Sequence, residues 1–142
     1  MKQIDRIFIQ WEIGGEQVLR LLLSRSGSVN RMGDGLPQEG SSLSMCMGRL
    51  EDSFAFDQIL GLMDSSWMDM TGRYELPDPQ GTISTLSVGL EGDELDTGFS
   101  FTYGMDSEGP PEEFVHLVES AISITDPWYE EQIIRKKQRR KK

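Results

Sequence analysis

The densest group of side chains that could do chemistry is a run of carboxylates at Glu91, Asp93, Glu94 and Asp96. Closely spaced carboxylates can act as general acid and base, hold a divalent cation, or bind a basic partner. An EF-hand calcium loop beginning at Asp93 is excluded, because its third position is the apolar Leu95. We therefore predict that these four carboxylates form an exposed turn that binds a partner.

A metal-dependent hydrolase is an alternative hypothesis for the acidic residues. Its ligands would come from scattered carboxylates such as Asp64, Asp69, Asp93 and Asp96. A calcium loop beginning at Asp64 fails, because Asp69 stands where the EF-hand requires glycine. The sequence thus offers oxygen ligands without a recognisable metal motif, and we predict no metal site.

Nucleophilic catalysis of the Ser-His-Asp or Cys-His type is disfavoured by the chain's single histidine, His116. It lies among glutamates on the polar face of a predicted amphipathic helix, which indicates a solvated side chain. Cys46 is the single cysteine, so the chain has neither an internal disulfide nor the usual Cys and His ligands of zinc. No phosphate-binding GxxxxGK[ST] loop occurs. We predict no catalytic residue and no cofactor.

A basic segment, residues 135–142, ends the chain and holds seven of its 14 Lys and Arg residues. Three hypotheses remain open for it: an arm that binds nucleic acid or a membrane surface, a segment that folds back onto carboxylates of residues 74–134, and a disordered solvated end. Charge blocks of this kind are commonly disordered, and we expect that state. The basic residues are Arg135, Lys136, Lys137, Arg139, Arg140, Lys141 and Lys142.

The rest of the chain is strongly acidic. Residues 1–134 carry seven basic and 24 acidic residues, a net charge of −17, and residues 74–134 contain 14 carboxylates and no Lys or Arg. The isoelectric point is near 4.5. Such a surface repels nucleic acid and attracts basic proteins.

No targeting or membrane segment is predicted. Charged residues interrupt the N-terminal apolar positions before they reach the length of a signal peptide's apolar core. The longest apolar run, residues 21–23, is far too short to span a bilayer. We expect a cytoplasmic protein without a membrane span.

The elements that must position these residues begin with a hairpin over residues 4–13 and 17–23. Both segments alternate between apolar and polar residues, and a three-residue loop through Gly14, Gly15 and Glu16 would pair Trp11 with Leu19, keeping one face buried. A third strand through residues 29–31 would complete a meander. The connecting loop, residues 24–28, contains hydroxyl and guanidinium groups that could bind an anion, although such loops are usually simple connections.

Residues 43–47 could form a short strand, and residues 67–76 have a mixed pattern. Residues 54–63 place apolar side chains on one helical arc and predict a helix on the sheet.

The clearest strands precede and follow the acidic turn, with apolar alternation over residues 86–90 and 95–103. Residues 109–111 then open a helix, and Asp126 and Pro127 indicate the N-cap and first position of another. The order predicts an α+β fold, with two or three helices on one face of an antiparallel sheet of five or six strands. We expect residues 1–134 to form one domain and residues 135–142 a separate tail.

The favoured functional hypothesis is a non-enzymatic, acidic protein-binding module for a basic partner, of the kind found among inhibitors and toxin-neutralising immunity proteins. Its support is the charge distribution and the lack of catalytic motifs. A protein that binds nucleic acid through the basic tail and a carboxylate-based hydrolase are the alternatives. The oligomeric state cannot be predicted from these patterns.

Overall fold

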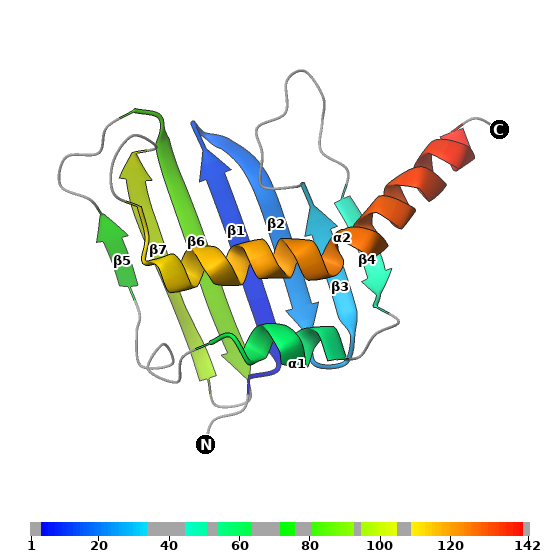
Figure 1. Ribbon diagram of the computed structural model, residues 1–142, viewed down its shortest axis with the longest axis horizontal. Coiled ribbons are helices and arrows are strands. Elements are labelled where there is room, and N and C mark those ends of the chain that lie inside the picture. Colours follow the sequence, from blue (N-terminus) through cyan, green and yellow to red (C-terminus); the bar gives the residue numbers. More distant parts are fainter. Residues whose placement is uncertain are drawn as a thin grey trace.

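The computed structural model describes residues 4–33, 45–50, 54–63, 72–75, 81–92, 95–104 and 109–140. They form two layers, a seven-stranded sheet and two helices that lie on the same face of it (Figure 1). The predicted α+β class is confirmed. The elements are β1 (Arg6–Ile13), β2 (Glu16–Ser24), β3 (Ser28–Met32), β4 (Met45–Arg49), α1 (Phe54–Leu60), β5 (Gly72–Glu75), β6 (Ile83–Gly92), β7 (Leu95–Gly104) and α2 (Glu112–Arg140).

The sheet has the order β4-β3-β2-β1-β6-β7-β5. The prediction of five or six antiparallel strands was wrong, because there are seven strands and β5 pairs in parallel with β7. The two edge strands, β4 and β5, have only five and four residues. β4 overlaps the short strand expected from residues 43–47, whereas the four residues of β5 are too few to show the alternation that predicts a strand.

The predicted meander of β1, β2 and β3 is confirmed, as is the pairing of Trp11 with Leu19. The predicted three-residue loop was wrong. Ile13 pairs with Glu16 across a two-residue turn, Gly14-Gly15, where both glycines have positive φ. A register shift after Trp11 leaves one extra residue in β2, a β-bulge that restores the register needed by the buried face.

The core lies between the sheet and the helices. Alternate residues of β1, β2, β6 and β7 face the buried sides of α1 and α2, as the periodicity predicted. Phe114 of α2 packs against Phe99 and Phe101 of β7, with ring centroids 4.8 Å apart in both pairs. These aromatic contacts fix the first half of α2 over the sheet.

Helix α2 is continuous from Glu112 to Arg140, so the prediction of a new helix beginning at Asp126 was wrong. Pro127 lies inside the helix, and Figure 1 shows α2 changing direction where it leaves the sheet beyond β4. A proline within a helix removes one backbone hydrogen bond and commonly causes such a kink. No helix in the described part of the chain is long and apolar enough to cross a membrane.

Arg31 of β3 anchors α2 to the sheet just before Pro127. Its side chain is completely buried and its Nη1 donates to the carbonyl of Ile122 at 3.1 Å and to Thr125 Oγ1 at 2.9 Å. Thr125 in turn donates to the carbonyl of Ala121 at 2.7 Å. Backbone carbonyls preceding the proline therefore have partners, and Asp126 is engaged by Arg31 instead of acting as an N-cap.

Candidate functional site

The structure brings two of the four predicted carboxylates together. Glu91 of β6 is the direct cross-strand partner of Asp96 of β7, so their side chains lie on the same face of the sheet. Asp93 and Glu94 lie outside the described residues. Like charges at directly opposed positions repel each other, and a nearby cation would lower that cost.

Arg6 of β1 supplies such a cation. Its Nε lies 2.9 Å from Glu91 Oε2, and it is the cross-strand neighbour of Glu91 on the side opposite Asp96. Sequence reasoning missed Arg6 because the pairing of β1 with β6 joins segments about 80 residues apart, and nothing local indicates it. No described residue forms a salt bridge with Asp96.

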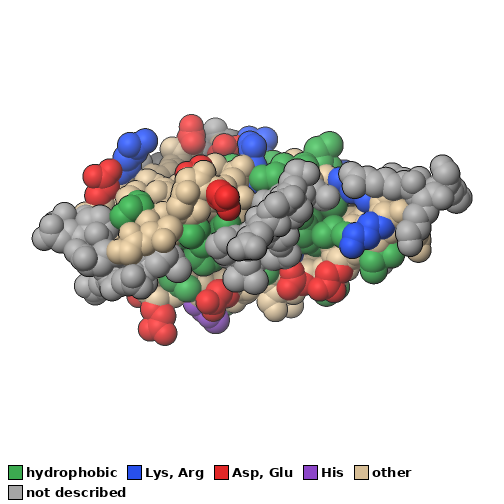
Figure 2. All heavy atoms as spheres, turned by 90° about the horizontal axis from the view of Figure 1, so that it is seen from above, with side chains coloured by type: hydrophobic (Ala, Val, Ile, Leu, Met, Phe, Trp, Pro, Cys, Tyr) green, Lys and Arg blue, Asp and Glu red, His purple; other side chains and the backbone are tan. Residues whose placement is uncertain are grey.

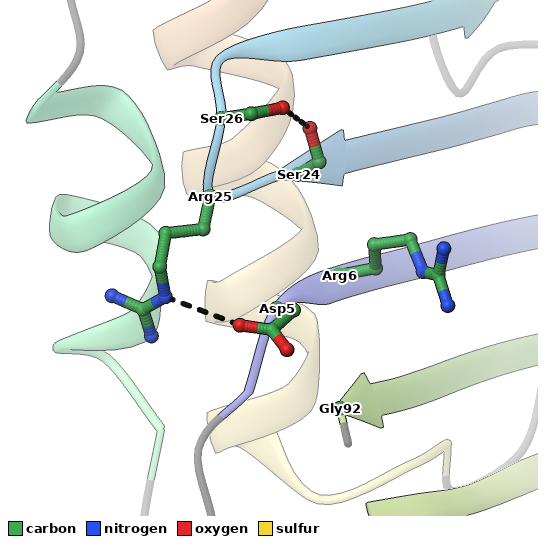
Figure 3. A pocket seen from close by; sticks show the side chains of 6 residues that line it. All are labelled: Asp5, Arg6, Ser24, Arg25, Ser26 and Gly92. Atoms are coloured by element: carbon green, nitrogen blue, oxygen red, sulfur yellow. Dashed lines mark hydrogen bonds and ion pairs between the residues drawn. The ribbon is translucent and has the colours of Figure 1, made fainter.

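A pocket of about 550 Å³ lies beside this pair, at the end of the sheet where β1 begins and β6 ends. We call it the end pocket. Figure 3 shows Arg25 and Asp5 pointing toward each other, while Arg6 points away from them. The end pocket is lined by Asp5, Arg6, Ser24, Arg25, Ser26 and Gly92.

Arg25 is bound on several sides by the protein itself. Its Nη2 donates to the carbonyl of Ile4 at 2.6 Å, and its guanidinium lies 3.6 Å from Asp5 and 3.8 Å from Asp57 of α1. The guanidinium also lies over the ring of Phe56, 5.1 Å from its centroid. The predicted register of β1 and β2, which pairs Trp11 with Leu19, places Asp5 opposite Arg25 when it is continued along the strands, so the sequence held a signal for this contact.

The hydroxyl groups of the pocket interact with each other. Ser24 Oγ and Ser26 Oγ are 2.8 Å apart, and the Ser28 amide donates to Ser24 Oγ at 3.1 Å. Among the described residues, neither serine has a histidine, lysine or carboxylate as a hydrogen-bond partner that could act as a general base. The hydroxyls can accept and donate hydrogen bonds to a ligand, but this arrangement does not activate a nucleophile.

Two guanidinium groups and one carboxylate, Asp5, line the end pocket, and carboxylates exceed guanidinium groups among the described residues when Glu91, Asp57 and Asp96 around it are included. The two guanidinium groups, Arg6 and Arg25, already pair with Glu91, Asp5 and Asp57. Asp96 adds a further carboxylate beside Glu91. A lysine or arginine side chain of a partner would find Glu91 and Asp96 beside the pocket, where both carboxylates are at least partly exposed.

The outward side of α2 forms a second acidic surface. Figure 2 shows carboxylates along the edge of the molecule where α2 lies, which is marked by the purple histidine. His116 is exposed there, as predicted. The exposed glutamates of this surface are Glu112, Glu113, Glu119, Glu130 and Glu131.

Residues 135–140 of the basic segment continue α2, whereas the sequence favoured a disordered tail. Arg135 pairs with Glu131 of the same helix at 2.5 Å, and Lys136 Nζ donates to the carbonyl of Met45 on β4. Lys137 is exposed. The side chains of Arg139 and Arg140, and the whole of Lys141 and Lys142, lie outside the described part.

Cys46 of β4 is buried, so its thiol is not accessible to a substrate. Within the described ranges, no three His, Cys, Asp or Glu side chains are arranged to hold a metal ion. Asp64 and Asp69 fall outside those ranges. No protein-family model matches this chain, and comparison with the curated proteins finds no relative.

Proposed function

We propose that this chain is a non-enzymatic protein-binding module that receives a basic surface of its partner at Glu91 and Asp96, beside the end pocket. The observation that carries the proposal is the Glu91–Asp96 pair beside the end pocket: these two carboxylates lie directly opposite each other, and the two guanidinium groups that line the pocket are already paired within the protein. Inhibition of a basic protein, or neutralisation of a basic toxin, is the class of function that fits such a module.

The partner's cationic side chain would bind Asp96 and share Glu91 with Arg6. Asp96 belongs to a ten-residue strand paired along its whole length with β6, so the backbone that carries both carboxylates is held by the sheet. Ser24 and Ser26 add hydroxyl groups to the neighbouring pocket wall. Preorganised acceptors of this kind reduce the ordering cost of binding.

The acidic side of α2 would act at longer range. Its exposed glutamates lie on a helix whose apolar side is packed on the sheet. This packing holds the glutamates in a fixed orientation relative to the sheet. An extended field of one sign accelerates encounter with an oppositely charged protein and repels nucleic acid. The proposal therefore predicts an association rate that falls with added salt.

A capture experiment with matched variants tests the proposal. Immobilised wild-type protein is compared with Glu91→Gln/Asp96→Asn and with a control, Glu16→Gln/Glu75→Gln, which removes the same charge from exposed positions on β2 and β5. We expect a basic protein to be retained by the wild type and the control and lost from the Glu91/Asp96 variant. Equal retention by all three would exclude Glu91 and Asp96 as the binding site.

Binding of nucleic acid through the basic segment predicts a different result. A gel shift with duplex DNA at two salt concentrations would show a complex that weakens steeply with salt and is lost when residues 135–142 are deleted. Absence of a shift at low salt is the result expected from the protein-binding proposal.

A further inference from the structure

The C-terminal part of α2, residues 127–140, extends beyond the β4 edge of the sheet (Figure 1). We call it the α2 arm. Its buried side is fixed by Tyr129, which is almost completely buried, and by Trp128, which lies against Gly48 of β4. The opposite side of the arm is exposed. Its residues take part neither in the packing of the core nor in the end pocket.

An exposed stripe runs along this opposite side through Glu130, Glu131, Ile134 and Lys137, all of which are exposed. Residues three and four apart lie on one face of a helix, so these side chains follow each other along the arm. The order along the stripe is acidic, apolar and basic. Ile134, at the centre of the stripe, is 55% exposed, so a partner that covers it would bury apolar surface.

This order is self-complementary. In a two-fold pair the same surface serves both copies, and a residue that contacts a second residue is matched by the reverse contact. Two antiparallel arms that meet at Ile134 would place Glu131 of each copy beside Lys137 of the other. Two isoleucines would then bury each other between two pairs of opposite charges.

We propose that the exposed stripe of the α2 arm pairs with the same stripe of a second copy of this chain, the helices running antiparallel across a two-fold axis near Ile134. Arg135 already contacts Glu131 within the helix, but an exposed pair of this kind contributes little and leaves Glu131 open to Lys137 of the second copy. The interface is small, so the association is expected to be weak and concentration-dependent.

Disulfide trapping tests the two-fold axis directly. Only a residue close to the two-fold axis lies next to the same residue of the second copy. Ile134→Cys should therefore form a disulfide-linked dimer under mild oxidation at least ten times faster than Ile83→Cys. Ile83 is the matched control, because it is 44% exposed on β6, away from the arm. The native Cys46 is buried and does not interfere. Equal rates for the two variants would overturn the proposal.

A charge swap tests the antiparallel register. Glu131→Lys and Lys137→Glu alone should each lower the dimer fraction measured by sedimentation velocity, whereas the double variant, which keeps the wild-type net charge, should restore it. Helix content by circular dichroism controls for folding of the arm. If the double variant fails to restore dimers, or if the single variants change only the retention of duplex DNA, the arm does not pair with itself.

Discussion

Arg31 Nη2 of β3 lies 2.7 Å from Asp126 Oδ1, one residue before the proline that kinks α2. The guanidinium is completely buried, and it also stacks over the ring of Tyr129, 4.3 Å from the centroid. Its Nε donates to the carbonyl of Gly33 at 3.0 Å. Through these contacts the buried guanidinium of Arg31 holds the kinked helix against the sheet.

Removing Arg31 is therefore expected to be far more damaging than removing a surface arginine. Arg31→Ala should lower the free energy of unfolding by about 3–5 kcal/mol, because several buried acceptors lose their donor. Arg20→Ala is the matched control on the neighbouring strand, where the exposed guanidinium lies over Phe8, and should cost less than about 1 kcal/mol. Urea unfolding of both variants checks the difference; similar midpoints would show that the network contributes little.

Arg31 also shows where sequence reasoning reaches its limit. The alternation of β1, β2, β6 and β7 predicted the buried face correctly, because apolar burial leaves a period-two pattern. Arg31 lies on that buried face. In the sequence, however, an arginine interrupts the apolar alternation that indicates a buried position. Its partners on α2 are about 90 residues away. When these partners are not known, Asp126 and Pro127 have the pattern of an N-cap and a first helical position. That pattern predicts the start of a new helix there.

The candidate site was predicted only in part, because local sequence patterns do not reveal contacts between segments that are distant in the chain. The hairpin that carries Glu91 and Asp96 follows from local alternation, and the structure pairs these two residues directly across its strands. The cation that pairs with Glu91 comes from β1, and this neighbour depends on sheet order, which local patterns do not specify. The charge balance of the end pocket could therefore be found only in the structure.

Gly48 should tolerate no side chain larger than hydrogen without displacing Trp128. A Cβ at this position would lie 3.2 Å from Trp128 Cζ2, closer than ordinary van der Waals contact. We expect Gly48→Val to lower the free energy of unfolding by about 1–3 kcal/mol, as overpacking commonly does. Trp128 fluorescence would report the displacement. Unchanged stability and spectrum would mean that the arm does not pack on β4 as described.

The two carboxylates of the hairpin should respond in opposite directions to neutralisation. Asp96→Asn removes a repulsion and should raise the free energy of unfolding slightly, by less than about 1 kcal/mol. Glu91→Gln removes the partner of Arg6 and should lower it by a similar amount. Urea midpoints at low salt measure both changes, and 1 M salt should reduce them. The same sign for both variants would contradict the pairing of Arg6 with Glu91.

Tyr103 should make stability depend on alkaline pH. Burial raises the pKa of its hydroxyl above the usual value of 10.0, although a hydrogen bond from Trp11 Nε1 at 3.1 Å opposes the shift. Above pH 10 the unfolded chain loses this proton more readily than the folded one, so the free energy of unfolding falls as pH rises. Tyr103→Phe should flatten that slope when urea unfolding is compared between pH 9 and pH 11. An unchanged slope would assign the effect to other groups.

The association rate with the captured basic protein tests the central proposal most directly. It is measured at low and high salt for the wild type, for Glu91→Gln/Asp96→Asn and for the control Glu16→Gln/Glu75→Gln. We predict that the Glu91/Asp96 variant associates several-fold more slowly than both others at low salt, and that high salt reduces the difference. Equal rates for the Glu91/Asp96 variant and the wild type would contradict binding at Glu91 and Asp96.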